Sequence, residues 1–181
     1  CARYSALLIL DEAHAVLEPI PPPQLSGTTI VQVGTLSKTL GALGGFVAGP
    51  TALVDLLVNR ARTYIFTTAP SPGDSAAAQA AIEFVQSGEG AALRARLRSS
   101  VGRIRPNHPS PIIPIVLGDE AAALRASQQL LERGLLVPAI RPPTVPVGSS
   151  RLRVALSAAH TDEQIEALLE GLYALETDGG R

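Results

Sequence analysis

A carboxylate, an imidazole and an amine occur in two short motifs near the start of the chain. The run LLILDEAH brings Asp11 and His14 directly after four apolar residues, and Lys38 follows in IVQVGTLSKTLGALGGF. A carboxylate can pair with a protonated ring nitrogen, and a lysine amine can lose its proton and form a Schiff base. These residue types together suggest catalytic chemistry. The structural alternative is that Asp11 only caps the turn after a strand.

Lys38 is the only lysine in the chain. Lysine and arginine together number 15, and the other 14 are arginines. Because arginine has replaced lysine at every other basic position, the lysine that remains is expected where arginine cannot substitute. Reversible loss of a proton and Schiff-base formation are the properties that arginine lacks.

Two short apolar runs position these groups. Leu7–Leu10 and Ile30–Val33 are typical of buried strands in a parallel sheet. Open α/β sheets bind ligands at the carboxyl ends of their strands. Asp11 and Lys38 both follow such ends, so we expect them at one edge of one sheet. A third short strand is expected at 46–48.

An acidic residue after an apolar strand also occurs in nucleotide-driven motors, where it holds Mg²⁺. That class needs a phosphate loop of the form G-x-x-x-x-G-K-[ST]. Lys38 and Thr39 match its last two positions, but Gln32 and Ser37 stand where the glycines belong. The order of the loop and the acidic strand is also reversed. The motor hypothesis is therefore disfavoured.

A pyridoxal phosphate (PLP) site accounts for every group. This cofactor needs an amine for its aldehyde, an acid for its ring nitrogen and donors for its phosphate and phenolic oxygen. Lys38 and Asp11 supply the first two, His14 can approach the ring oxygen, and Thr35 offers a hydroxyl to the phosphate. Taken alone, His14 is better explained by a structural role, and Thr35 equally well by turn stabilisation. Their combination favours PLP.

Composition bounds the class of protein. The chain has 181 residues, 46% hydrophobic and 17% charged, with a net charge of −1. We expect about one α/β domain, with no nucleic-acid or membrane surface and no metal site. The arginines between 94 and 105 are expected on a solvated helix face. The single cysteine, Cys1, excludes an intrachain disulfide and favours a cytoplasmic protein.

The remaining pattern predicts alternating helices and strands. Thr161 and Gln164 form a predicted capping box, and Glu18–Gly27 is a predicted loop. The segment TYIFTTAPSP, at 63–72, is expected to be a short strand followed by a Pro-rich turn. The other predicted helices are 50–62, 74–86, 91–103, 119–133 and 161–175, and the other predicted strands are 111–118, 135–140 and 151–158.

The RLR triplet places two arginines on one strand face. Alternation puts Leu152 on one face and both Arg151 and Arg153 on the other. An inward arginine in an apolar sheet requires an anion. An edge strand with both guanidinium groups in water is the alternative.

DEAH, the lysine of GTLSK with its trailing GG, and the segment AIRPPTVPVGSSRLRVALSAAHT resemble the α-oxoamine synthases, a family of fold-type I PLP-dependent enzymes. The resemblance covers nearly the whole chain but only about the C-terminal half of a family member. It implies that residues 1–87 are the remainder of the large PLP-binding domain, with a mostly parallel sheet, and that 88–181 form a small α/β domain. We therefore expect the chain to be the C-terminal part of a longer protein.

The resemblance also implies a reaction. Family members are acyltransferases that condense an amino acid with an acyl thioester and release CO₂. The IRPPTVP stretch favours the member of biotin biosynthesis, which joins L-alanine to pimeloyl-CoA or a pimeloyl carrier protein. Glycine C-acetyltransferase and 5-aminolevulinate synthase activities remain alternatives. So does a non-catalytic fragment that needs a partner chain.

Further site residues follow from the resemblance. Lys38 holds PLP, and Asp11 keeps its ring nitrogen protonated. Thr68 contacts the cofactor phosphate of the neighbouring subunit, which implies a homodimer with a shared active site. Arg153 binds the amino-acid carboxylate, and Thr144 lies beside the acyl substrate.

Overall fold

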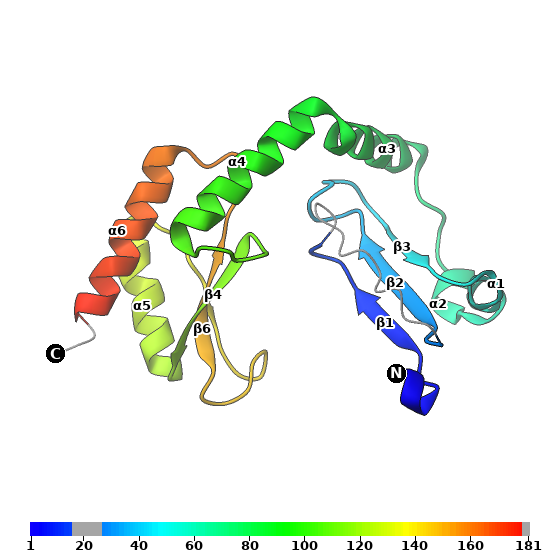
Figure 1. The fold of residues 1–181 in the computed structure, drawn as a ribbon, viewed down its shortest axis with the longest axis horizontal. Helices are drawn as coiled ribbons and strands as arrows, with labels where there is room; N and C mark the ends of the chain where they lie inside the picture. Colours follow the sequence, from blue (N-terminus) through cyan, green and yellow to red (C-terminus); the bar gives the residue numbers. More distant parts are fainter. Residues whose placement is uncertain (16–26, 179–181) are drawn as a thin grey trace. The chain divides into compact units, whose positions relative to one another are not determined.

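The chain folds into two compact units in a computed structural model that describes residues 1–15 and 27–178. The first unit is Cys1–Ala91 and the second Ala92–Arg181, each described here by itself (Figure 1). The division falls within helix α4 (Gly88–Ile104). The assignment of domains to 1–87 and 88–181 stays a prediction. The predicted loop Glu18–Gly27 lies, apart from Gly27, outside the described residues.

The first unit is built on a three-stranded sheet. After a short 3-10 helix, η1 (Ala2–Tyr4), come strands β1 (Leu8–Asp11), β2 (Ile30–Thr35) and β3 (Gly45–Ala48). Strand β2 lies between the other two, parallel to β1 and antiparallel to β3 (Figure 1). All three predicted strands are confirmed, and the sheet is mixed within the described part of the chain.

The strands of this sheet differ in burial. Val31 on the central strand is 4% exposed, whereas Leu7 and Ile9 at the edge are 46% and 60% exposed. The expectation that Leu7–Leu10 is fully buried is therefore wrong for this chain. Strand β1 has a strand neighbour on one side only within the described residues, so its apolar side chains remain in contact with solvent.

A glycine brings β2 and β3 into close contact. Gly34 faces Phe46 across the two strands. A Cβ at position 34 would lie 2.3 Å from the Phe46 ring, which is far inside van der Waals contact. Only glycine lets this ring lie flat against the sheet near the carboxyl end of β2.

Helices α1 (Thr51–Arg60), α2 (Arg62–Ile65) and α3 (Pro72–Gln86) complete the first unit. The short strand predicted at the start of 63–72 is wrong, because residues 63–65 belong to α2. Ala61 leaves the helical region at ψ 102, and its carbonyl then accepts hydrogen bonds from the next turn, which restarts the helix.

The second unit has the predicted order of strand, helix, strand, strand, helix. Its elements are β4 (Ile112–Gly118), α5 (Glu120–Glu132), β5 (Ala139–Ile140), β6 (Ser150–Ala155) and α6 (Asp162–Asp178). The strands are antiparallel in the order β4-β6-β5. The strand predicted at 135–140 is reduced to two residues. Pro138, just before it, has no N–H to donate to a ladder.

The second unit contains a continuous apolar core. Leu130 of α5 and Leu152 of β6 are fully buried within it. Helix α5 packs on the sheet (Figure 1). The core side chains are Val101, Ile113, Ala126, Leu130, Val137, Leu152, Val154, Leu156, Ile165 and Leu168.

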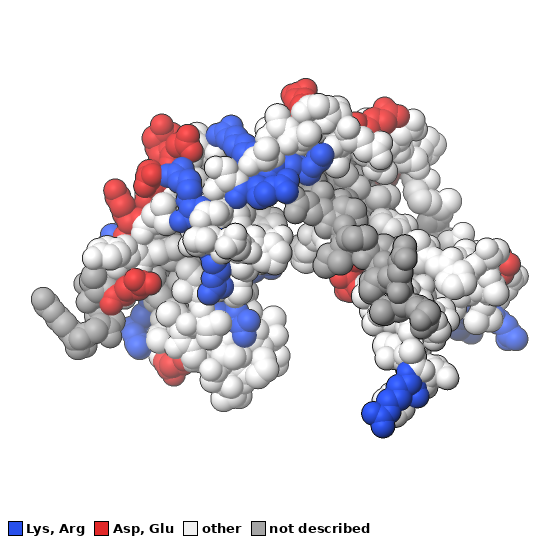
Figure 2. All heavy atoms as spheres, viewed as in Figure 1, with Lys and Arg blue, Asp and Glu red and all other residues white. Residues whose placement is uncertain are grey.

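Ion pairs join α4 to α6 within this unit. Arg103 pairs with Asp162, at 3.0 Å, and with Glu166. Figure 2 shows acidic side chains over the start of α6 with basic side chains close by. The expectation of a purely solvated arginine face is therefore wrong at Arg103, whose side chain is only 29% exposed.

Candidate active site

Asp11 is the last residue of β1, and its exposed carboxylate is held by the following turn. Its Oδ1 atom accepts a hydrogen bond from the backbone N–H of Ala13 at 3.0 Å. The next residue, Glu12, donates its N–H to Val33 of β2 at 2.8 Å, which extends the strand pairing past Asp11. His14 lies exposed in the same turn. One side-chain oxygen of Asp11 therefore serves the turn, and the other faces solvent.

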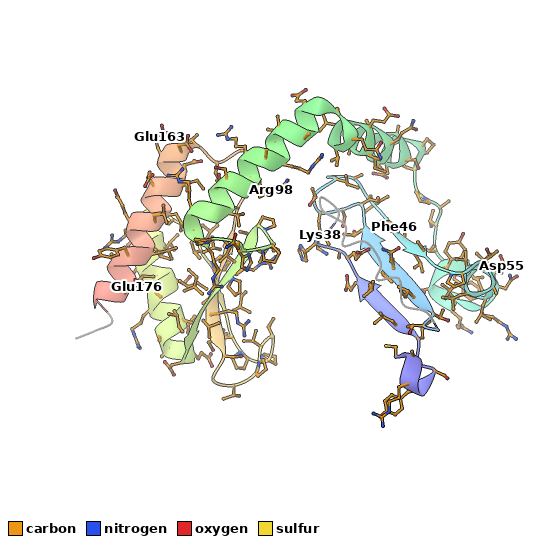
Figure 3. The ribbon with its side chains drawn as sticks, viewed as in Figure 1. Lys38, Phe46, Asp55, Arg98, Glu163 and Glu176 are labelled. Carbon is orange, nitrogen blue, oxygen red and sulfur yellow. The ribbon has the colours of Figure 1, made fainter. Side chains whose placement is uncertain are left out.

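Lys38 lies in the loop that connects β2 to β3 (Figure 3). The backbone N–H of Leu36 donates to the Gly44 carbonyl at 2.9 Å and closes this loop. The Lys38 carbonyl accepts a hydrogen bond from Gly41, which has a φ of +62°. The Lys38 side chain is exposed, and no ion pair joins it to any described residue.

Both charged groups lie at one edge of the sheet. Strands β1 and β2 are parallel, with Asp11 opposite Val33, so their carboxyl ends coincide. Neighbouring strands are about 4.8 Å apart. Side-chain alternation along β2 puts Thr35 on the same face as Val33 and therefore as Asp11. A carboxylate, a hydroxyl and the loop that carries the amine thus share this edge.

Thr35 stabilises the turn that leads to Lys38. Its hydroxyl donates to the Gly44 carbonyl at 3.1 Å, accepts from the Ser37 N–H at 3.2 Å and lies 2.8 Å from the Ser37 hydroxyl. Sequence reasoning missed Ser37, although a second hydroxyl beside Thr35 in GTLSK was a visible signal. Both hydroxyl hydrogens can be used within this turn, so a phosphate bound here would take the place of one of these hydrogen bonds.

A side-chain hydrogen bond joins the residue after β1 to β2, on the opposite face from Asp11. The Gln32 amide donates to Glu12 Oε2 at 2.9 Å. Sequence reasoning missed this pair as well. Its signal was a lone glutamine inside the apolar run IVQV.

Thr68 lies in the exposed segment between α2 and α3. None of the hydrogen bonds or ion pairs of the described residues joins it to the edge that carries Asp11 and Lys38. Its predicted contact with a neighbouring subunit stays a prediction.

Arg153 and Thr144 belong to the second unit. Arg153 is half-buried on β6, while Leu152 and Val154 point to the core, as alternation predicts. The edge-strand alternative is wrong, because β6 is the central strand. No carboxylate among the described residues pairs with Arg153. Thr144 lies exposed in a turn, where its N–H donates to the Arg141 carbonyl at 3.0 Å.

The polar groups at the sheet edge suit an organic cofactor that has an aldehyde and an anionic group. It offers an amine, a carboxylate oxygen free of the turn, and hydroxyl groups. Within residues 1–15 and 27–178, no group of three or more His, Cys, Asp or Glu residues could hold a metal ion. No helix in the described part of the chain is long and apolar enough to cross a membrane.

The sheet edge and the fold define an enzyme class. Residues 1–172 match the aminotransferase class I and II family, and the chain belongs to that family. Among its relatives is the 8-amino-7-oxononanoate synthase of Anaeromyxobacter dehalogenans strain 2CP-1, which is 46% identical over 193 residues. That match covers 98% of this chain and 48% of the relative.

A second relative agrees with the first. The 8-amino-7-oxononanoate synthase of Thioalkalivibrio sulfidiphilus is 45% identical over 95% of this chain and 48% of its own length. The chain thus spans about half the length of the curated relatives it matches. The predicted family resemblance is confirmed by these matches.

Solved structures share the fold. Serine palmitoyltransferase from S. paucimobilis, a structure that contains a PLP–myriocin aldimine, matches 98% of this chain and 49% of its own, with a TM-score of 0.80 and 27% identity. The 8-amino-7-oxononanoate synthase of Francisella tularensis matches 83% of this chain and 47% of its own, with a TM-score of 0.69 and 26% identity. The predicted α/β fold class is confirmed.

Proposed function

We propose that this chain carries the cofactor-binding lysine and its acid partner in a PLP-dependent acyltransferase. The reaction is the condensation of L-alanine with a pimeloyl thioester to 8-amino-7-oxononanoate, with release of CO₂ and the thiol, in biotin biosynthesis. Because the chain spans about half of its relatives, the complete activity requires a polypeptide equivalent to their other half.

One observation carries the proposal. The only lysine of the chain follows β2, and Asp11 ends the parallel neighbour β1. An amine and a carboxylate at the same sheet edge are the two groups that PLP chemistry requires most. The names of the relatives then support the choice of substrates.

PLP, when bound, supplies an electron-withdrawing ring that stabilises negative charge at the amino-acid Cα. Lys38 would hold the cofactor through its aldehyde, and its amine, once the alanine amine has displaced it, would be free to accept the Cα proton as a general base. The free oxygen of Asp11 would pair with the protonated ring nitrogen. The negative charge of Asp11 keeps that nitrogen protonated.

Hydroxyl and imidazole groups complete the cofactor contacts. We assign His14 to the phenolic oxygen and Thr35, with Ser37 beside it, to the phosphate. Thr68 is assigned to the phosphate in a neighbouring subunit, which makes a homodimer with shared active sites part of the proposal. We also place the protein in the cytoplasm, because its single cysteine is consistent with a reducing compartment.

We assign two residues of the second unit to substrate binding. Arg153 has no carboxylate partner among the described residues, and its planar guanidinium can bind the alanine carboxylate through two hydrogen bonds. Thr144, in an exposed turn, is assigned to the acyl substrate. The acyl carrier is CoA or a carrier protein.

A different acyltransferase is the second candidate. The similarity in fold to serine palmitoyltransferase reaches a TM-score of 0.82 at 28% identity. The 8-amino-7-oxononanoate synthases are 42–49% identical, which favours alanine and a pimeloyl thioester over serine and a long acyl chain.

The test supplies the missing half as a separate chain. The 181 residues are co-expressed with the preceding half of the Anaeromyxobacter relative, loaded with PLP and treated with borohydride. Reduction should fix PLP to the peptide that contains Lys38. The assembly should then turn over alanine and pimeloyl-CoA in preference to glycine or serine.

Lys38→Arg is the matched control, because it keeps the positive charge but cannot form the Schiff base. This variant should show no fixed PLP and no product. PLP fixed elsewhere in an active assembly would refute the assignment of Lys38. Turnover of glycine or serine, but not alanine, would favour the second candidate.

A further inference from the structure

The hydrogen bond between Gln32 and Glu12 lies between the two strands that end at the candidate site. Gln32 is opposite Leu10 in the β1–β2 pairing, so its side chain and that of Glu12 project from the same face. The amide N–H of Gln32 donates to Glu12 Oε2 at 2.9 Å, in a partly buried position. The contact spans 20 residues of sequence.

Glu12 is more constrained than its neighbour Asp11. It is half-buried, whereas Asp11 is exposed. Its N–H also donates to Val33 of β2 at 2.8 Å. Its Oε1 atom is buried and has no hydrogen-bond partner among the described residues. A partly desolvated carboxylate depends strongly on the one donor that the described residues offer it.

Two bonds therefore fix the residue after Asp11 to the strand that leads to Lys38. The backbone bond fixes the height of Glu12 along β2, and the side-chain bond fixes its rotation. The Asp11 carboxylate points to the other face of the sheet and is oriented by the turn that starts at Glu12. Any slip or rotation at Glu12 consequently moves Asp11 relative to the β2–β3 loop.

We propose that Gln32 and Glu12 are positioning residues, whose hydrogen bond sets the distance and angle between the Asp11 carboxylate and Lys38. Neither side chain touches the cofactor in this role, since both lie on the opposite face from Asp11. The proposal rests on the proposed function, because positioning has a consequence only if Asp11 and Lys38 bind one ligand.

The first variant is Gln32→Glu, which replaces the donor with a second carboxylate and makes the contact repulsive. In the assembly described above, the PLP concentration that gives half-maximal borohydride trapping at Lys38 should rise at least about tenfold. The absorption band of the bound cofactor should also shift, because the charge beside its ring nitrogen has moved.

The exchanged pair is the decisive variant. Glu12→Gln combined with Gln32→Glu restores one amide donor and one carboxylate acceptor with their positions swapped. The PLP concentration for half-maximal trapping should return to within about threefold of that of the unsubstituted protein. The loss of one hydrogen bond would change this concentration by a larger factor. A site that needs Glu12 or Gln32 for any reason other than their mutual bond would not be rescued by the exchange.

The chain offers a matched control in α3. The amide of Gln79 donates to Glu83 Oε1 at 2.9 Å, which is the same type of bond at the same distance on an exposed helix. Gln79→Glu creates the same repulsion away from the sheet and should leave PLP trapping unchanged. Thermal unfolding of each variant is measured beside trapping, and Gln32→Met replaces Gln32→Glu if the latter does not fold.

The outcomes separate the two proposals. The positioning role is supported if Gln32→Glu weakens PLP trapping at Lys38, the exchanged pair restores it and Gln79→Glu leaves it unchanged. Unchanged trapping in Gln32→Glu, or no rescue by the exchange, overturns the role alone. Failure of the unsubstituted assembly to fix PLP on Lys38 overturns the proposed function and the positioning role together.

Discussion

At the scale of single residues, the proposed function gives each of the two Asp11 oxygens its own role. One oxygen accepts the Ala13 N–H and holds the turn, while the other is available to a ligand. An asparagine can accept the first bond through its amide oxygen, but it carries no negative charge. The structure therefore offers a substitution that separates the local fold from the proposed chemistry.

In the assembled enzyme, Asp11→Asn should still fold and bind PLP but should lose most exchange of the alanine Cα proton with solvent. We expect a decrease of about a hundredfold or more, the effect that loss of one electrostatic contact in an active site typically has. Proton exchange is followed by NMR in deuterated water. Exchange near the parent rate would contradict the proposed role of Asp11.

Asp119→Asn is the control for this substitution. Asp119 also accepts a backbone N–H through its side chain, from Ala122 at 2.8 Å, at the start of α5. The same chemical change there should leave exchange unaltered. A similar loss in both variants would show that the effect arises from general destabilisation.

At the scale of elements, the start of α6 shows how a local sequence signal determines a helix end. The Thr161 N–H donates to Gln164 Oε1 at 2.9 Å, and the Gln164 N–H donates to Thr161 Oγ1 at 3.3 Å. The predicted capping box is thus confirmed in both directions. The backbone amide of Glu163 and the Thr161 hydroxyl also lower the pKa of the Glu163 carboxyl below its usual 4.5.

Thr161→Ala should destabilise the second unit by about 1 kcal/mol, the usual effect of losing an N-cap side chain. It should also raise the pKa of Glu163 towards 4.5, because one of its two hydrogen-bond donors is removed. Urea unfolding and carboxyl NMR titration measure the two effects. Thr161→Ser, which keeps the hydroxyl, should change neither.

The pH dependence follows from the direction of this shift. The pKa of Glu163 is lower in the folded state, so its contribution is fully present above 4.5 and is lost as the pH falls through the folded-state pKa. As the pH falls, the folded protein loses the stability that ionised Glu163 contributes. This loss should be smaller in Thr161→Ala. An unchanged Glu163 titration in this variant would contradict the assigned cause.

At the scale of the whole molecule, the two units differ in how much apolar surface they bury. Within the described part of the first unit, the buried apolar side chains are Val31, Leu40 and Ala78, whereas the second unit has a continuous core. Large apolar side chains stay exposed in the first unit, including Ile9, Tyr64 and Phe66. Exposed apolar surface of this kind favours association.

The 181-residue chain alone should therefore self-associate, bind PLP weakly and make no 8-amino-7-oxononanoate. Light scattering and the product assay, repeated at several protein concentrations, measure these properties. The matching half of a relative should suppress association by covering the first unit. Turnover by a monodisperse monomer of the chain alone would contradict both the need for a second polypeptide and the shared site of the proposed homodimer.

The sequence by itself determined most of the elements and the class of chemistry. Short apolar runs, the capping box of α6 and the alternation in RLR are local signals, because each depends on neighbours within a few residues. Asp11 and Lys38 could be placed at one sheet edge since parallel strands align their carboxyl ends. The family resemblance came from the same motifs.

Only the tertiary structure decided which contacts these elements make. The bond between Gln32 and Glu12 and the approach of Phe46 to Gly34 depend on the pairing of strands that are separated in sequence. The helix at Arg62–Ile65, predicted as a strand, shows the same limit. A strand needs a partner to receive its hydrogen bonds, and whether one is present is a property of the fold and not of the segment.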